Sequence, residues 1–382
     1  MVVEIYRIKF VFVLISFVFL AACMQTKIIE QHAIINTYGI DISEESENLI
    51  ETVILSYIFD EQAENVTTIN YGKGKTIKEA NQNAEKKSSF TFLPGQIRLV
   101  LYGKETAEKG FKNYLNVLIR DARLSDMMYL AVSETTAKDI LLLGQENADI
   151  DMGQYMEKLI EKEIKGDSIP NVSLHKLTHT YEDPGKDPIM PLISLTDNKI
   201  AITGMALFQN DKYVGKISME DAFLVNLFQN KVHDRQIHLS ISREPFLKYL
   251  SAPQANRDQL HLSFLIIDGE SKTRLTDIKE LSYQTDVNLK VILNETSETF
   301  KDENEQFANL LEKEVEEEVK RQYKKLLATL QNANSDPLGL GSIYRAHKKN
   351  GKLTAKEWHQ KFPEITINFN VDVKLINTGI KQ

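Results

Sequence analysis

Cysteine is almost absent from this sequence, since only one of its 382 residues, Cys23, is a cysteine. A single cysteine excludes a disulfide within the chain. The nine prolines and 17 glycines form no Pro-rich or Gly/Ser-rich tract, which argues against a long disordered stalk. Beyond the first 22 residues, no apolar run reaches the roughly 20 residues that a membrane-spanning helix needs.

Positive charge is also in the minority, because the sequence has 46 Lys and Arg residues but 54 Asp and Glu residues, a formal net charge of −8. This balance argues against a nucleic-acid binder, which would show a basic patch. It also argues against polybasic adhesion to anionic lipid headgroups. The apolar and charged fractions are those of an ordinary globular protein, and the length suits two or three domains.

Sequence signatures of catalysis are missing as well. There is no G-x-S-x-G nucleophile elbow, no phosphate loop and no H-E-x-x-H zinc motif. His175, His179 and Asp183 have a spacing that could suit a metal, but they lie in a polar, Pro-containing segment without a fixed chelating face. His233 and His238 give no stronger indication of a metal site. We therefore expect no enzyme activity, no cofactor and no metal.

Other candidate residues are better explained by structure than by chemistry. Glu316, Glu317 and Glu318 fall on the expected wet side of a long helix, where a charge run is usually a solvated face. Gly339 and Gly341 lack the Lys-Ser/Thr of a phosphate loop, so we expect turns with positive φ. Trp358 and Phe362 lie four residues apart on a short predicted helix and are expected in the core, with an interface role as the alternative.

The first residues have the layout of a secretory signal. A short segment with Arg7 and Lys9 precedes an apolar run over residues 10–19, and small residues follow it. Cys23 directly follows Leu20-Ala21-Ala22, which looks like a bacterial lipobox. We expect residues 1–22 to be a signal peptide and Cys23 to carry a diacylglyceryl group. Ordinary secretion and an uncleaved anchor are the alternatives, but neither explains the only cysteine at that position.

A diacylglyceryl group supplies two acyl chains at one residue. Each buried methylene contributes about 0.8 kcal/mol, and stable attachment to a membrane needs two chains rather than one. The expected protein is therefore tethered by lipid on the outer face of a membrane and does not span it.

The rest of the chain alternates strand-like and helix-like segments, which indicates an α+β, multi-domain fold. Thr76, followed by Glu79, is a capping box that predicts a helix start. Expected helices cover residues 107–120, 136–143 and 219–228; expected strands cover 49–59, 97–102, 127–132, 200–208 and 213–217. The polar stretch over 170–191 is expected to be an irregular crossing. We expect domains over 23–197, 198–275 and 276–382.

The last third carries the clearest pattern. Apolar residues alternate with polar ones over 260–266, 287–293 and 365–375, which predicts an antiparallel sheet with one wet face. Between the last two runs, residues 302–330 form an amphipathic helix with an apolar stripe. The stripe is Phe307, Leu310, Leu311, Val315, Val319, Tyr323, Leu326 and Leu330. Helix and sheet each need a cover for one apolar face, and we expect them to cover each other.

Several stretches, in this order and spacing, resemble one known family over nearly the whole chain. They are residues 74–80 (Gly-Lys-Thr-Ile-Lys-Glu-Ala), 99–107, 114–115, 120–121, 204–208 (Gly-Met-Ala-Leu-Phe), 211–215, 336–341 (Asp-Pro-Leu-Gly-Leu-Gly), Trp358, Phe362-Pro363 and Gly379. With the lipobox, this pattern resembles the Ger(x)C family, the lipoprotein C subunits of nutrient germinant receptors in endospore-forming bacteria.

The resemblance implies a mixed α/β fold that ends in a helix-backed sheet. It also implies a place in the spore inner membrane beside two integral-membrane receptor subunits, A and B, and a role in germination through protein contacts. Two alternatives stay open: a lipid-anchored solute-binding protein, which would favour two doubly wound lobes, and a surface hydrolase, whose motifs are missing.

Overall fold

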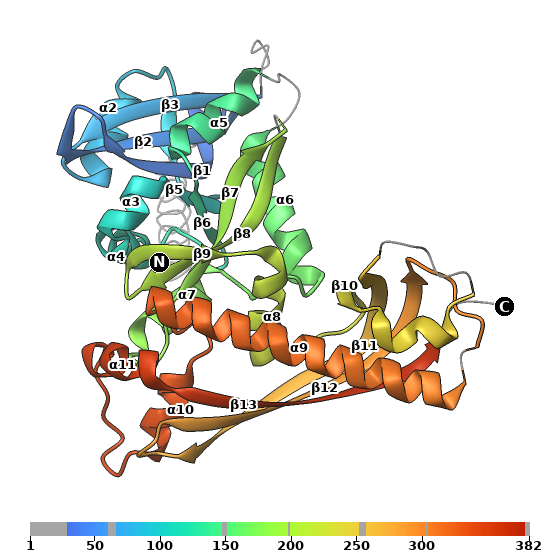
Figure 1. Cartoon of the computed structure of the whole chain (residues 1–382). Coiled ribbons are helices and arrows are strands. Elements are labelled where there is room, and N and C mark those ends of the chain that lie inside the picture. Colours follow the sequence, from blue (N-terminus) through green and yellow to red (C-terminus); the bar gives the residue numbers. More distant parts are fainter. Residues whose placement is uncertain are drawn as a thin grey trace, which may run out of the picture.

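Two β-sheets and the helices around them make up the protein (Figure 1). The computed structural model describes residues 29–59, 66–146, 151–197, 199–251, 257–302 and 304–378. Within this part of the chain, the first sheet has nine strands and the second has four. The α+β class predicted from the sequence is confirmed.

The first sheet has a parallel centre and antiparallel flanks. Its order is β3-β2-β1-β5-β6-β7-β8-β9, and β4 also pairs with β1. The pairs β1–β5, β5–β6 and β6–β7 are parallel, whereas β1–β2, β2–β3, β7–β8 and β8–β9 are antiparallel. The strands are β1 (His32–Ser43), β2 (Ser46–Ile58), β3 (Thr67–Gly74), β4 (Thr91–Leu93), β5 (Leu99–Tyr102), β6 (Tyr129–Ser133), β7 (Ile189–Thr196), β8 (Lys199–Gln209) and β9 (Lys212–Ile217).

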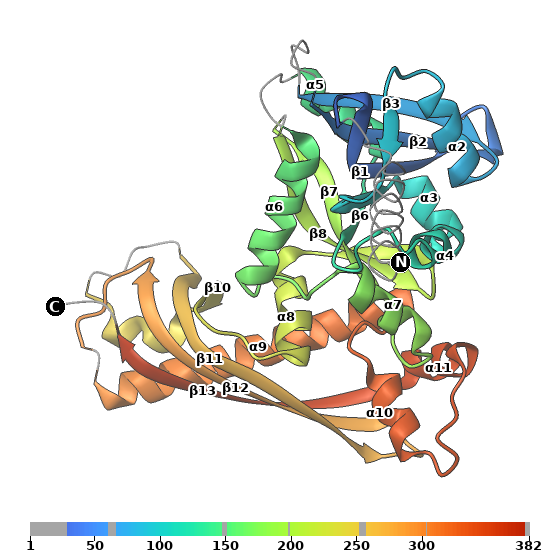
Figure 2. The same ribbon diagram turned by 180° about the vertical axis from the view of Figure 1, so that it is seen from behind.

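Helices cover both faces of this sheet, as the apolar character of β5 requires, because all four of its residues are buried. Leu99 and Leu101 pack in the core under α5 (Ala137–Glu146) and α6 (Met152–Lys165). Val100 and Tyr102 point to the other core, which lies under four further helices. These are α2 (Ile77–Glu85), α3 (Lys104–Lys109), α4 (Lys112–Arg120) and α7 (Leu174–Glu182). Figure 2 shows α6 and α4 on opposite sides of the strands.

Two helix starts are fixed by side chains. The hydroxyl of Thr76 accepts a hydrogen bond from the backbone N–H of Glu79, which confirms the predicted cap, and Glu79 accepts from the N–H of Lys75. Asp41, at the end of β1, caps α5 from a distance in sequence. Its carboxylate accepts from the N–H groups of Ala137 (2.8 Å) and Lys138 (2.9 Å). This contact fixes α5 to the end of β1.

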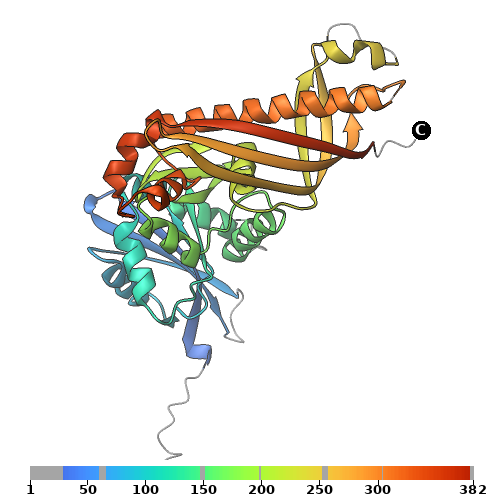
Figure 3. The same cartoon turned by 90° about the horizontal axis from the view of Figure 1, so that it is seen from below.

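The second sheet is formed by β10 (Arg235–Ser242), β11 (Gln259–Asp277), β12 (Ser282–Thr296) and β13 (Thr366–Thr378). Helix α9 (Glu305–Ala333) runs along one face of it (Figure 3). Leu311, Val315 and Val319 are buried on that helix. The ring of Tyr323 stacks on Phe369 of β13, with 5.0 Å between centroids. The predicted helix and its sheet cover each other, although Leu310 of the stripe is only partly buried.

One strand direction in this sheet differs from the prediction. The β10–β11 and β11–β12 pairs are antiparallel, but β12 and β13 are parallel. The reason is α9, which at 29 residues is about 44 Å long. It returns the chain to the end where β12 began, so the next strand runs in the same direction.

Helix α8 (Met219–Gln229) joins the two sheets into one body. Its residues 222–228 are all buried. Leu224 and Leu227 share one apolar core with α5, α6 and the second sheet. The hydroxyl of Tyr323 on α9 donates to the carbonyl of Leu224, at 3.2 Å. The halves of the chain are thus packed against each other and not merely linked.

Two local predictions are corrected. The segment 107–120 is not one helix, because it is broken at Gly110, whose φ is +116°. The segment 170–191 is not an irregular crossing, because it holds α7 and the start of β7. The expected domain boundary at 197/198 lies between β7 and β8, and the one at 275/276 lies in β11.

Candidate functional site

The residue predicted to carry lipid, Cys23, lies outside the described residues, which begin at Ile29. In the described part of the chain, no helix combines the length and hydropathy needed to cross a membrane.

The histidine candidates lie on the surface. His175 and His179 are neighbours on α7, with 4.6 Å between ring centroids. Asp183 turns away from them, because its carboxylate pairs with Arg345 (3.0 Å) and accepts from the hydroxyl of Ser342 (2.8 Å). The structure therefore does not bring these three residues together. Among the described residues, no group of three or more His, Cys, Asp and Glu side chains is arranged to hold a metal.

His233 and His238 are both exposed, on the approach to β10 and on β10 itself. Nδ1 of His233 lies 3.2 Å from the carbonyl oxygen of Ile267. The structure gives this pair no common site.

The glutamate run on α9 is less solvated than predicted. Only Glu317 is exposed; it pairs with Lys320. Glu318 is largely buried and pairs with Arg321. Glu316 accepts a hydrogen bond from the backbone N–H of Val373 on β13, at 3.2 Å. The three glutamates therefore have three different surroundings, because α9 lies close to β13.

The two glycines after Asp336 have different roles. Gly339 has a φ of +78°, as predicted for a turn, and precedes α10 (Leu340–His347). Gly341 lies inside that helix, so the predicted positive φ is wrong for it. A Cβ atom there would lie 2.6 Å from Cα of Gly185 and 2.6 Å from the Trp358 ring. Gly341 is needed for close approach of two segments.

A buried polar junction, made by Asp187, Asp336, Trp358 and His359, joins the first sheet to the last part of the chain. Trp358 and Phe362 are fully buried, as predicted. Asp336 is also fully buried. Its carboxylate accepts hydrogen bonds from the N–H of Gly339 (2.9 Å), the N–H of Gly341 (3.0 Å) and Nε1 of Trp358 (2.9 Å). A buried carboxylate with this set of donors is a fixed structural point.

Asp187 holds the other side of the junction. It exchanges hydrogen bonds with Asp336, since the N–H of Asp187 donates to the Asp336 carbonyl (2.8 Å) and the N–H of Asp336 donates to the Asp187 carboxylate (2.9 Å). Nε2 of His359, on α11 (Ala355–Lys361), lies 2.9 Å from the same carboxylate. Asn210, at the turn after β8, donates its N–H to it as well. Segments more than a hundred residues apart are therefore tied at one point.

Burial raises the pKa of Asp336 to about 7, although the hydrogen bonds from Gly341, Trp358 and Gly339 lower it. The negative charge of Asp187 adds to the increase. The junction thus contains a carboxyl group that titrates close to neutral pH.

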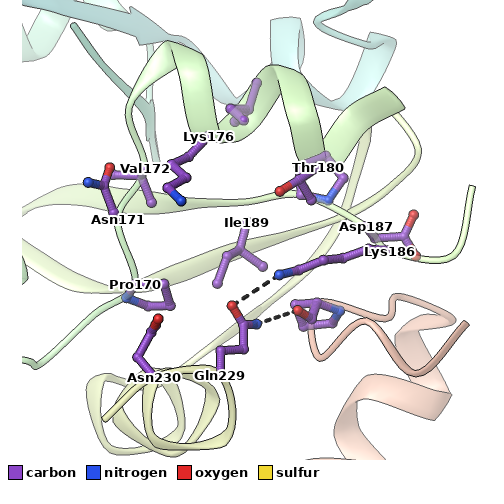
Figure 4. Close-up of a pocket in the computed structure, with 13 residues that line it drawn as sticks. Pro170, Asn171, Val172, Lys176, Thr180, Lys186, Asp187, Ile189, Gln229 and Asn230 are labelled. Carbon is purple, nitrogen blue, oxygen red and sulfur yellow. Dashed lines mark hydrogen bonds between the residues drawn. The ribbon is translucent and has the colours of Figure 1, made fainter. Parts of the chain in front are cut away.

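A pocket opens beside the junction (Figure 4). Its volume is about 270 Å³, and its walls come from α7, the start of β7, the end of α8 and the segment after α9. Lys186 lines it and donates from Nζ to Oε1 of Gln229, at 3.0 Å. Gln229 in turn donates to the carbonyl of Pro337, at 2.5 Å. The pocket is bordered by both halves of the chain.

Sequence reasoning missed Lys186, Asp187 and Asp336 as parts of this site. Lys186 and Asp187 lie in an Asp-Pro-Gly-Lys-Asp-Pro segment for which the sequence predicts only an irregular crossing. The available signal was the Asp-Pro steps at 183–184 and 336–337, which have a glycine one residue later (Gly185) and two residues later (Gly339). Such steps mark rigid turns, but they do not say that the two turns meet.

Comparison with known families gives matches over nearly the whole chain. Residues 25–195 match a family described as the spore germination protein N-terminal domain. Residues 203–379 match one described as spore germination B3/GerAC like, C-terminal. The division between the two matches lies close to the turn between β7 and β8.

Individual relatives agree with the families. The chain is 23% identical over 376 residues to the spore germination protein GerQC of Bacillus cereus, covering 98% of this chain and 99% of that protein. It is 22% identical over 323 residues to the putative spore germination protein YfkR of Bacillus subtilis, covering 82% and 79%. The crystal structure of the GerBC protein matches with a TM-score of 0.55 at 15% identity, covering 89% of this chain and 97% of that chain. This last match shows a shared fold.

Proposed function

Because the chain belongs to the family of GerAC-like spore germination proteins, and thus has a role in germination, we propose that it is a lipid-anchored subunit of a nutrient germinant receptor. In this proposal it lies in the spore inner membrane beside integral-membrane subunits A and B, and it acts through protein contacts rather than chemistry. The observation that carries the proposal is the match of both family domains, in order, over residues 25–195 and 203–379.

The anchor in this proposal is Cys23, which follows Leu20-Ala21-Ala22 as in a lipobox. The chain from Cys23 to Ile29 can span at most about 20 Å, at about 3.5 Å per residue. With lipid on Cys23, Ile29, which lies three residues before β1, would stay within that distance of the membrane surface. The protein would then reach its partners from a fixed end of the first sheet.

Tethering has a physical consequence for the contacts. Confining a protein to the membrane plane raises its effective concentration for a neighbour, so a weak interface can be well occupied. A version of the chain that starts after Cys23 should therefore fold normally but bind membrane partners poorly at cellular concentrations.

The alternative of a lipid-anchored solute-binding protein is less well supported. That class favours two doubly wound lobes with a hinge between them. Here only the first sheet has a parallel centre with helices on both faces, and the second sheet is covered by one long helix. The two halves also share one apolar core through α8, which leaves little freedom for lobe closure.

The test is co-purification of the protein from detergent-solubilised spore membranes, combined with a nutrient germination assay on a deletion strain. We expect two membrane proteins to co-purify with the chain and the deletion strain to respond poorly to nutrients. An unrelated lipoprotein from the same membranes serves as the control for nonspecific recovery. Recovery of the chain alone, together with a normal nutrient response of the deletion strain, would refute the proposal.

A further inference from the structure

Two lysine side chains point into the pocket beside the junction. Lys176 comes from α7, and Lys186 comes from the loop before β7 (Figure 4). They belong to opposite walls, so the pocket lies between two ammonium groups. The electrostatic effect of Lys176 lowers the pKa of the Lys186 ammonium, in addition to the larger lowering that burial causes. The two positive charges thus disfavour each other.

The charge of Lys186 is not matched by a paired carboxylate among the described residues. Its Nζ donates to the neutral amide oxygen of Gln229. The carboxylates of Asp336 and Asp183 are close enough to raise the pKa of Lys186. Both are held by other donors, Asp183 by Arg345 and Ser342, and Asp336 by Trp358 and two backbone N–H groups.

The carboxylate of Asp187 is likewise held by other groups. Although it lines the pocket, its carboxylate contacts His359 and accepts from the N–H groups of Asn210 and Asp336. In Figure 4 its carboxylate points away from Lys176. Among the described residues, no carboxylate forms an ion pair with Lys176. The charged residues that line the pocket are Lys176, Lys186 and Asp187, so the lining carries a net charge of +1, in a protein whose overall charge is −8.

The remaining walls suit a small polar ligand. Asn171 and Asn230 supply amide groups, and Thr180 supplies a hydroxyl. Val172 and Ile189 supply apolar surface. A volume of about 270 Å³ lies near the lower end of the range for small-molecule sites, which begins at about 300 Å³.

We propose that this pocket binds a small, soluble oxyanion, a carboxylate or a phosphate, between the ammonium groups of Lys176 and Lys186. The bound anion would accept charge-assisted hydrogen bonds from both lysines, which are stronger than neutral ones. It would relieve the repulsion between the two ammonium groups.

Such a ligand would also strengthen the contact between the two halves of the chain. Lys176 belongs to the helices of the first sheet, whereas Gln229 and Pro337 belong to α8 and to the segment after α9. Since only the folded chain forms this pocket, binding stabilises the folded state by mass action. This inference does not depend on the lipid anchor or on the membrane partners.

The test is isothermal titration calorimetry of the full chain in detergent, with sodium phosphate and with sodium acetate as probes, at pH 7 and constant ionic strength. We expect saturable binding of at least one anion to one site, and the choice between the probes identifies the phosphate or the carboxylate as the recognised group. Lys186→Met and Lys176→Met should each lower the affinity at least ten-fold. Lys112→Met, which changes an exposed lysine on α4, should leave it unchanged.

Lys186→Met removes a partly buried charge, so we expect a melting temperature no lower than that of the parent. If that variant fails to fold, Lys176→Met decides the matter, because Lys176 is exposed and its removal costs little stability. The absence of saturable binding with both probes would overturn the inference. So would equal affinity of the parent and the Lys176→Met variant.

Discussion

Glu312 of α9 accepts a hydrogen bond from the backbone N–H of Leu375 on β13, with 2.7 Å between Oε1 and the nitrogen. Glu316, one turn later on the helix, accepts from the N–H of Val373. β13 is the last strand of its sheet, so these N–H groups point away from β12. An exposed strand edge is a template for pairing with another chain. The helix that covers the face of the sheet therefore also occupies part of its open edge.

Replacing both glutamates tests this role. Glu312→Ala combined with Glu316→Ala should lower the free energy of unfolding by about 1 to 3 kcal/mol, because two hydrogen bonds to charged groups are lost. It should also increase self-association through the freed edge. Urea unfolding and light scattering measure the two effects. Glu317→Ala, at the exposed neighbour, is the control and should change neither; an equal effect of the control would contradict the assignment.

The apolar stripe of α9 gives a second prediction. Leu311 is 1% exposed, so Leu311→Asp places an unpaired carboxylate in the core and should cost several kcal/mol. Glu317→Lys removes only an exposed pair with Lys320, which contributes about 0.5 kcal/mol or less. Thermal unfolding followed by circular dichroism should show a large loss for the first variant. Identical melting temperatures for the parent and both variants would show that the face assignment is wrong.

Much of the second sheet could be predicted because its residues repeat with a period. Alternation over 260–266 and 365–375 gives strands, and the stripe from Phe307 to Leu330 gives the helix. The parallel direction of β13 was also within reach. A long helix between two neighbouring strands returns the chain to its starting end. The first β-strand, β1, was harder to predict because nearly all of its residues are buried and no alternation remains.

The junction could not be predicted in the same way. Asp187 contacts Asp336 and His359 across separations of 149 and 172 residues. These polar residues lie in loops or at helix ends, where no periodicity reports which side chains meet. Trp358 and Phe362 were expected in the core because they are large and apolar. Their neighbour Asp336 had no such signal, since a carboxylate is rarely buried without partners.

The close approach at Gly341 gives a third prediction. Alanine is a better helix former than glycine, by about 1 kcal/mol, so Gly341→Ala would stabilise an isolated α10. In the protein, the added Cβ would meet Gly185 and Trp358 at 2.6 Å, and we expect a net loss of about 1 to 3 kcal/mol. Gly95→Ala is the control, because nothing lies within 4 Å of its Cβ position. Urea unfolding should show a lower stability for Gly341→Ala than for Gly95→Ala. Equal stability of the two variants would contradict the close approach at Gly341.

The raised pKa of Asp336, about 7, predicts how stability depends on pH. Between the ordinary value near 4 and about 7, the folded chain holds a proton that the unfolded chain has released. The contribution of Asp336 to the free energy of unfolding therefore falls as pH rises through this window, by up to about 1.4 kcal/mol per pH unit, and levels off above about pH 8. Asp41, with a pKa of about 6, acts in the same direction at lower pH.

Asp336→Asn isolates this contribution. The variant should be less stable overall, because an amide cannot accept from Gly339, Gly341 and Trp358 as a carboxylate does. Its unfolding free energy should nevertheless depend less on pH between about 6 and 8 than that of the parent. Asp41 is unchanged in both proteins and serves as the internal reference. Parallel curves for the parent and the variant in urea unfolding would show that Asp336 does not titrate there.

Lipid attachment is tested most directly at Cys23. The thiol is the group that would accept the diacylglyceryl moiety, and no other cysteine can replace it. Cys23→Ala should therefore abolish labelling with a fatty-acid probe and leave the precursor uncleaved at that site. Because the sequence has no second thiol, the loss of label should be complete rather than partial. Met24→Ala keeps the thiol and should be labelled like the parent, whereas equal label on the Cys23→Ala variant would rule out Cys23 as the anchor.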